Sequence, residues 1–113
     1  MPHLTNVRRT RRRWALSQSE LASLMGISQS IVSRLETGES IPDATLALRL
    51  QVVFGHSPRA LFPGLYGSVE DAVMANAATF DRTLGERQDY ATQTKRRLLT
   101  AMVHRARSNR RSP

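Results

Sequence analysis

Residues 17–38 read SQSELASLMGISQSIVSRLETG, and this stretch decides how the chain folds. Ser17 and Glu20 have the spacing of a capping box, in which the serine accepts from a backbone amide of the first turn while the glutamate reaches back. Gly26 comes where a left-handed residue would end that helix. A second helix is predicted from Ser28 up to Gly38. The stretch therefore predicts two short helices joined by a tight turn.

The second of these helices has one apolar side and one polar side. Ile27, Val32 and Leu35 are placed to pack against the first helix. The opposite side is polar, with the residues Ser28, Gln29, Ser30, Ser33 and Arg34. An α-helix fits the major groove of DNA, and amide or guanidinium side chains suit the edges of bases. This pattern favours a helix that contacts DNA.

The rest of residues 1–67 also has helical periodicity. A first helix is predicted over about residues 4–14, with Val7 and Trp14 buried. A fourth helix should begin at Pro42–Asp43, with the apolar residues Leu46, Leu50 and Val53. A short fifth helix should begin at Ser57–Pro58, where proline's missing amide costs nothing. Because β-branched residues form no alternating runs, we predict an all-α fold.

Beyond residue 67 the character of the sequence changes. Ser68 begins another helical pattern, with the apolar residues Val69, Val73, Ala77, Phe80 and Leu84. Gly85 weakens the pattern, which resumes from Leu98 to Ala106, so either two helices or one weakened helix is predicted. We expect a DNA-binding domain at 1–67, a helical extension with a dimerisation role at 68–107, and a disordered basic tail at 108–113.

Residues 4–62 closely resemble the Cro/CI-type (XRE-like) family of helix-turn-helix transcriptional regulators. The matching residues are Val7 and Arg11, the runs Leu16-Ser17-Gln18, Glu20-Leu21-Ala22 and Gly26-Ile27-Ser28, then Ser33-Arg34-Leu35-Glu36, Gly38 and Ile41-Pro42. The resemblance implies a five-helix, lambda-repressor-like DNA-binding domain, here with a C-terminal helical extension. Two departures are Ala15, where a glycine is common, and the bulky Trp14.

The resemblance also implies roles for individual residues. Gln29, Ser30 and Arg34 would read bases, since an amide pairs well with adenine and a guanidinium with guanine. Ile31 could touch a thymine methyl group or belong to the core. Gln18 would bond a phosphate at the start of its helix. Ser28 and Ser33 are further candidates for phosphate contacts or for capping. A phosphate contact or a surface ion pair for Arg34, and a solvated helix start for Gln29, are the alternatives.

Arg11 and Glu36 match family positions that form a partly buried ion pair, so their implied role is structural. The other basic residues lie mainly at the two ends of a chain whose net charge is +8. Candidates for flanking phosphate contacts are Arg8, Arg12, Lys95, Arg96 and Arg97. Neutralising phosphates releases counterions and adds affinity without sequence preference. Simple solvation, or an acidic protein partner for the C-terminal residues, remains an alternative.

These observations lead to a sequence-specific regulator of transcription that binds double-stranded DNA. We expect a repressor that binds an inverted-repeat operator as a homodimer, because paired half-sites supply affinity and specificity. The apolar stripes after residue 67 could form that dimer, pack back on the domain, or bind another protein. One alternative is an antitoxin that autoregulates its operon and masks a toxin with residues 68–113. Another is a nonspecific nucleic-acid binder.

The sequence does not favour a metalloprotein, an enzyme, a membrane protein or a secreted protein. The chain has no cysteine, and His3, His56 and His104 are scattered, so we expect neither a metal site nor a cofactor. No arrangement of carboxylates or nucleophiles indicates an enzyme. No apolar run reaches the length of a membrane span, and the basic N-terminus lacks the apolar stretch of a signal peptide. The expected location is the cytoplasm, at the nucleoid.

Overall fold

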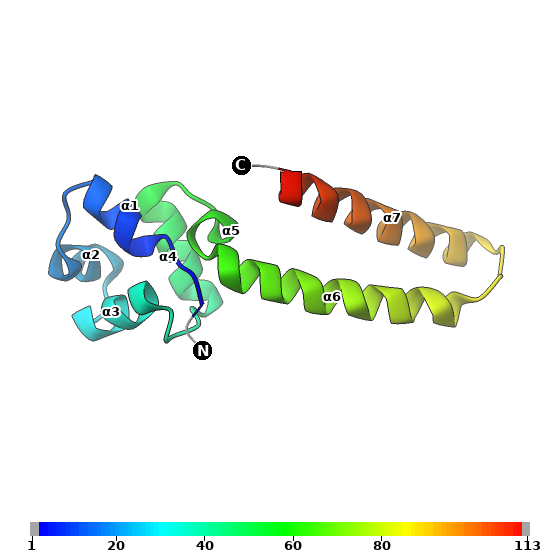
Figure 1. The fold of residues 1–113 in the computed structure, drawn as a ribbon, viewed down its shortest axis with the longest axis horizontal. Helices are drawn as coiled ribbons and strands as arrows, with labels where there is room; N and C mark the ends of the chain where they lie inside the picture. The colour runs from blue at the N-terminus through cyan, green and yellow to red at the C-terminus, as the bar shows by residue number, and fades with distance from the viewer. Residues whose placement is uncertain (1–2, 112–113) are drawn as a thin grey trace. The chain divides into compact units, whose positions relative to one another are not determined.

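A computed structural model describes residues 3–111, and every regular element in that range is a helix. The helices are α1 (Val7–Arg13), α2 (Gln18–Met25), α3 (Gln29–Thr37), α4 (Ala44–Phe54), α5 (Pro58–Leu61), α6 (Pro63–Leu84) and α7 (Tyr90–Arg111) (Figure 1). The chain divides into two compact units, Met1–Gly67 and Ser68–Pro113. Helix α6 begins in the first unit and continues into the second. The all-α fold with a helical extension is confirmed.

The predicted helix starts and stops are present. Ser17 and Glu20 form both bonds of a capping box at the start of α2. The side chains of Ser28, Asp43 and Ser57 each accept a hydrogen bond from the backbone amide three residues further on, at the starts of α3, α4 and α5. Gly26 ends α2 in the left-handed region, at φ 70°. A non-glycine residue there would carry the strain of that conformation.

The first unit has a continuous apolar core. Its buried members are Val7, Leu21, Ala22, Met25, Val32, Leu35, Leu50, Phe54, Leu61 and Phe62. Side chains from all five helices up to α5 contribute, with Phe62 directly after α5. The core holds α2 and α3 at a fixed angle, and this positions the outer face of α3.

The prediction that Trp14 is buried is wrong, because its side chain is 63% exposed. Helix α1 ends at Arg13, and Ala15 adopts a left-handed backbone with φ 59°. The chain therefore turns away before Trp14 can continue the buried side of the helix. The buried positions of α1 are instead Val7, Thr10 and Arg11. Ala15 occupies the conformation that glycine adopts most easily.

The first helix is predicted to begin at about residue 4, but α1 begins at Val7. The residues before Val7 form an arm. The amide of His3 donates to the carbonyl of Gly38 (3.3 Å), and the amide of Asn6 donates to that of Leu61 (2.7 Å). A Cβ atom on Gly38 would overlap the backbone of His3. Gly38 therefore both ends α3 and allows the arm to cross it.

The second unit is a helical hairpin. Helix α6 ends at Leu84, Gly85 takes a left-handed conformation with φ 61°, and α7 begins at Tyr90. Of the two arrangements predicted for this segment, two helices is correct. The prediction that residues 108–111 are disordered is wrong, because they continue α7, where Asn109 and Arg110 bond Glu70 and Asp71 of α6. Residues 112–113 of that predicted tail lie outside the described residues.

Candidate DNA-reading surface

The outer face of α3 exposes the three predicted base readers. The side chains of Gln29, Ser30 and Arg34 are all exposed, while Val32 and Leu35 on the other side are buried in the core. Ser33 lies between the two sides and is half-buried. The rigid core thus presents an amide, a hydroxyl and a guanidinium outward from one short helix.

The start of α3 is held by its own hydroxyl groups. The Ser28 side chain accepts from the Ile31 amide at 3.4 Å, and its Oγ lies 3.1 Å from the Oγ of Ser30. Ser28 is therefore a helix cap in this structure. Ile31 is half-buried and packs against the core, which is the second of the two roles considered for it. Ser30, which precedes Ile31, is exposed.

Arg11 and Glu36 form the predicted ion pair, which joins α1 to α3. Arg11 Nε donates to Glu36 Oε2 at 2.5 Å, and Arg11 Nη2 donates to Oε1 at 3.0 Å. Its remaining nitrogen, Nη1, donates to the Leu16 carbonyl at 2.8 Å. The Glu36 side chain is fully buried, and that of Arg11 is 10% exposed. Such a two-pronged geometry orients both groups as well as pairing their charges.

The buried Glu36 carboxylate also orients the helix that precedes the reading helix. Gln18 Nε2 donates to Glu36 Oε1 at 3.0 Å, which leaves the Gln18 Oε1 to face α3. That oxygen accepts from Gln29 Nε2 at 3.3 Å. Ser19 Oγ donates to Gln29 Oε1 at 3.1 Å. A chain of hydrogen bonds thus runs from a buried ion pair to an exposed candidate base reader.

The same contacts set the charge state of the pair. Burial alone would raise the pKa of Glu36, but hydrogen bonds from Arg11 and Gln18, the Arg11 charge and a hydrogen bond from Arg8 outweigh it. The pKa of Glu36 therefore lies below its ordinary value. The hydrogen bond to Glu36 is the main reason that the pKa of Arg11 is raised. Both groups are charged at neutral pH.

A basic depression lies beside this ion pair, along the first turns of α1. It has a volume of 420 Å³ and is lined by Thr5, Asn6, Arg8, Arg9, Arg12 and Glu36. Arg8 Nε donates to Glu36 Oε1 at 3.3 Å, and its side chain remains 48% exposed. Arg9 and Arg12 are exposed. Three guanidinium groups around one depression fit an anion such as a phosphate.

Two residues of this region are not predicted by the sequence. Ser19 bonds Gln29, and Thr37 is exposed further along α3. Thr37 is three residues after Arg34, so helical spacing alone could have placed it on the same face. Ser19 meets Gln29 only because α2 and α3 pack together, and neither residue's sequence context signals that contact.

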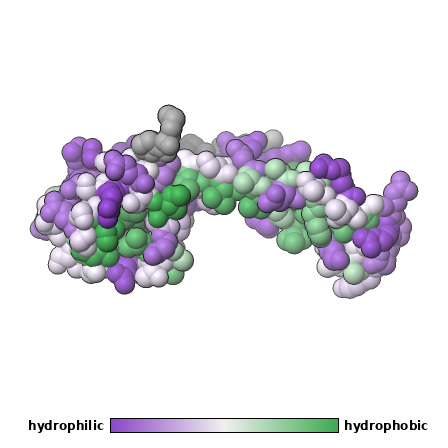
Figure 2. All heavy atoms as spheres, turned by 90° about the horizontal axis from the view of Figure 1, so that it is seen from below, coloured by the Kyte–Doolittle hydropathy of each residue, from purple (hydrophilic) through white to green (hydrophobic). Residues whose placement is uncertain are grey.

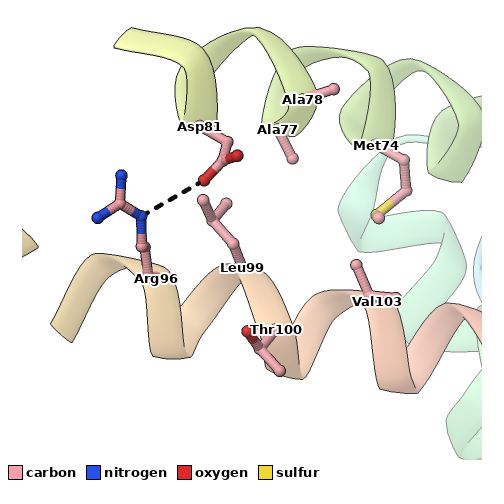
Figure 3. A pocket seen from close by; sticks show the side chains of 8 residues that line it. All are labelled: Met74, Ala77, Ala78, Asp81, Arg96, Leu99, Thr100 and Val103. Atoms are coloured by element: carbon pink, nitrogen blue, oxygen red, sulfur yellow. Dashed lines mark ion pairs between the residues drawn. The ribbon is translucent and has the colours of Figure 1, made fainter. Parts of the chain in front are cut away.

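The predicted basic residues of α7 differ in their surroundings. Lys95 and Arg97 are exposed, and Arg97 donates to the Thr94 hydroxyl at 3.1 Å. Arg96 turns into the hairpin, where its Nε lies 3.8 Å from an Asp81 oxygen (Figure 3). It also donates to the carbonyls of Gly85 and Arg87. Arg96 therefore holds the hairpin turn, whereas Lys95 and Arg97 face solvent.

The profile of the helix-turn-helix family, of the Cro/CI type, matches residues 8–61. This segment belongs to the helix-turn-helix family. The match covers α1 to α5, which are the helices that build the reading face. Neither a curated protein nor a solved structure matches the chain. The helix-turn-helix domain is a DNA-binding regulatory domain, and the chain is accordingly a DNA-binding regulator of transcription.

Within residues 3–111, no helix is both long and apolar enough to cross a membrane. Among the same residues, no three His, Asp or Glu side chains come together as metal ligands.

Proposed function

We propose that this chain is a bacterial or phage regulator that recognises a specific inverted-repeat operator as a homodimer and represses transcription there, at the nucleoid in the cytoplasm. The observation that carries the proposal is the exposed row of Gln29, Ser30 and Arg34 on a helix fixed by a buried ion pair. Because the helix that carries these side chains is already held in place, its backbone loses little freedom on binding. A repressor of this kind acts by occupying a promoter.

Each reader has a distinct part in this proposal. Arg34 donates two hydrogen bonds to O6 and N7 of guanine, and Gln29 pairs with N6 and N7 of adenine. The Gln29 amide bonds Gln18 and Ser19 and keeps one hydrogen on Nε2 and one lone pair on Oε1 for the base. Gln18 keeps one Nε2 hydrogen on Glu36 and donates the other, together with the backbone amides at the start of α2, to a phosphate. Ser30 contributes a shorter contact between them.

The basic depression on α1 supplies affinity without sequence preference in the same proposal. Arg9 and Arg12 face solvent there, and Arg8 is held by Glu36 with almost half of its side chain exposed. Ser28 and Ser33 flank the readers, and their hydroxyl groups can donate to phosphates. Ser28 caps α3 as an acceptor, so its hydroxyl hydrogen is not used by the cap. Lys95 and Arg97 on α7 are further flanking candidates, whereas Arg96 serves the hairpin turn.

Selection of bound sequences from a random DNA pool tests the proposal. The expected consensus is an inverted repeat with half-site centres about 34–36 Å apart, one turn of DNA. Arg34→Ala should relax preference at one base pair per half-site by about 1–3 kcal/mol. The double change Arg9→Ala and Arg12→Ala should weaken binding to all sequences alike and lower the salt slope by about 2.

Two outcomes of this selection would overturn the proposal. One is the absence of any consensus, which would indicate nonspecific binding driven by charge. The other is an equal loss of affinity for all sequences on Arg34→Ala, which would make Arg34 a phosphate contact. Ser33→Ala is the matched control on the same helix, and we expect it to alter affinity without changing the consensus.

An antitoxin is the alternative function, and the exposed apolar side chains of the hairpin are the observation that favours it. Val69, Val73, Phe80 and Leu98 are 52%, 45%, 44% and 58% exposed. A toxin could cover them while the helix-turn-helix domain autoregulates the operon. A toxin encoded next to this gene that forms a stoichiometric complex with residues 68–113 would support this function.

A further inference from the structure

The hairpin has a second apolar stripe in addition to the one that joins its two helices. The joining stripe of α6 comprises Glu70, Met74, Ala77, Asp81 and Leu84, at steps of four and three residues. It faces the α7 residues Thr92, Arg96, Leu99, Val103 and Ala106, which have the same steps. This is the spacing of an antiparallel coiled coil. Among the described residues of the unit, only Leu84 and Ala106 are buried apolar side chains.

The second stripe consists of Val69, Val73 and Phe80 on α6 and of Leu98 and Met102 on α7; we call it the hairpin face. Each member on α7 is one residue before a member of the joining stripe. The same holds on α6, where Val69, Val73 and Phe80 come one residue before Glu70, Met74 and Asp81. In an antiparallel pair, the second helix runs in the reverse direction and also faces the first helix. Each of these two differences inverts the direction in which a step of one residue turns about the helix axis. The two shifts therefore point to the same side of the hairpin.

The hairpin face exposes more apolar surface than we expect for a helix pair whose outer sides contact only solvent. Four of its five side chains are between 44% and 58% exposed, and hydrophobic patches are visible on both units in Figure 2. A two-helix hairpin whose joining stripe includes charged residues and two alanines buries little apolar surface by itself. Covering this face would supply the missing core of the unit.

The charges of the two helices indicate what covers the face. Residues 72–80 of α6 read AVMANAATF, with no charged side chain, whereas residues 90–111 contain no Asp or Glu and many basic residues. A strongly acidic partner would suit α7, but it would leave the neutral surface of α6 uncovered. A neutral surface of small and apolar side chains suits another copy of itself. Close approach of two such helices is permitted by the alanines.

We propose that the hairpin face binds the same face of a second copy, with α6 crossing α6 of the partner antiparallel about a two-fold axis near Asn76. The four helices then form one bundle, in which α7 also lies opposite α7 of the partner, with Lys95 and Arg105 on the same side of α7 as Leu98 and Met102. Helix α6 from residue 68 to 84 is about 25 Å long, and two helices span about 20 Å, so the footprint approaches that of standard interfaces. This inference rests on the homodimer of the proposed function and locates it.

The opposite side of the hairpin provides a matched control. A groove of 320 Å³ opens there between the helices, and Ala78 and Thr100 are on its rim (Figure 3). Ala78 is exposed and two residues from Phe80, so a substitution tests α6 without touching the hairpin face. Val52, 85% exposed on α4 beside Leu24 and Leu48, controls for a second group of exposed apolar side chains.

Sedimentation equilibrium of the full chain without DNA tests the inference. The wild-type chain should be a dimer, and Phe80→Glu should weaken the dimer at least about 100-fold, because a carboxylate would be buried unpaired. Ala78→Glu and Val52→Glu should change the dissociation constant by less than about threefold. A monomeric wild type, or a Val52→Glu chain that is monomeric while Phe80→Glu still pairs, would overturn the inference.

Oxidative crosslinking keeps the test decisive if Phe80→Glu unfolds the hairpin. The natural chain has no cysteine, so Asn76→Cys introduces a single thiol near the proposed axis. It should form a covalent dimer, while Ala78→Cys should not. Equal crosslinking of both would overturn the antiparallel α6 contact.

The dimer and the reading of DNA can fail separately. Phe80→Glu should bind a duplex containing one half-site with unchanged affinity and consensus, and lose affinity only for the inverted repeat. If no consensus exists in any variant, the reading of DNA fails while sedimentation still reports on the hairpin face.

Discussion

The two units of this protein contrast in how much apolar surface they bury. In the helix-turn-helix unit, ten buried apolar side chains from α1 to just beyond α5 form one core. The hairpin unit buries only Leu84 and Ala106 among its described apolar side chains, although α6 and α7 have 22 residues each. Helix length is thus no measure of stability, because a helix is stabilised mainly by what its apolar face contacts. The helix-turn-helix unit therefore has a core of its own, whereas the hairpin leaves most of its apolar side chains exposed.

The largest expected effect tests the core of the first unit. Leu21→Ala removes a fully buried side chain from α2, and it should lower the free energy of unfolding by about 3–5 kcal/mol. Leu24→Ala on the same helix, where the side chain is 60% exposed, should change it by less than about 0.5 kcal/mol. Urea unfolding of both variants measures the difference. Similar losses for the two would contradict the boundary of this core.

The second effect concerns the ion pair that links α1 to α3. Glu36→Gln leaves Arg11 buried without its counter-charge and should cost about 3 kcal/mol at pH 7. Because the pKa of Glu36 is lowered on folding, its stabilising contribution is complete above the unfolded pKa and is lost as the pH falls through the folded value. The deficit of the variant relative to the wild-type chain should therefore shrink below about pH 4.

Urea unfolding of both chains between pH 7 and pH 3 measures this deficit. A deficit that stays constant down to pH 3 would mean that folding does not lower the pKa of Glu36. Glu20→Gln is the control acid of the same unit: it is exposed and its pKa is lowered mainly by hydrogen bonds to the backbone and side chain of Ser17. We expect only a small change in stability for that variant.

A third, smaller effect tests the hairpin. Leu84 is the one fully buried large side chain described in that unit, and Leu84→Ala should cost about 2–3 kcal/mol. Because the unit has its own set of contacts, hydrogen exchange should accelerate in residues 68–107 and remain unchanged in α2 and α3. Loss of protection in both units at once would show that they unfold as a single cooperative body.

The smallest effect is a gain of stability at the turn between α1 and α2. Ala15 has φ 59°, a conformation that disfavours a residue with a Cβ atom. Ala15→Gly should raise the free energy of unfolding by about 0.5–1 kcal/mol, since the strain relieved exceeds the added freedom of the unfolded chain. Thermal unfolding measures it. The reverse kind of change, Gly55→Ala at φ 75°, should destabilise by a similar amount.

Local signals in the sequence were sufficient for the helices and for part of the site. Ser17, Ser28, Asp43 and Ser57 bond amides at helix starts, and these short-range contacts depend only on nearby residues. The Arg11–Glu36 pair was accessible through the family resemblance. The contact of Gln18 with Gln29 was not, since it depends on the packing of α2 against α3. The roles of Gln29, Ser30 and Arg34 in reading bases stay predictions.

The sequence by itself determined where the helices begin and end, because caps, glycines and apolar spacing act within a few residues. Tertiary structure decided which faces are covered. Trp14 has the spacing of a core residue, yet the left-handed turn at Ala15 leaves it exposed. Val69, Val73, Ala77, Phe80 and Leu84 form one apolar pattern in the sequence, but α7 covers Leu84 and partly Ala77 and leaves the others exposed. A helix offers several apolar faces, and only a packed neighbour selects among them.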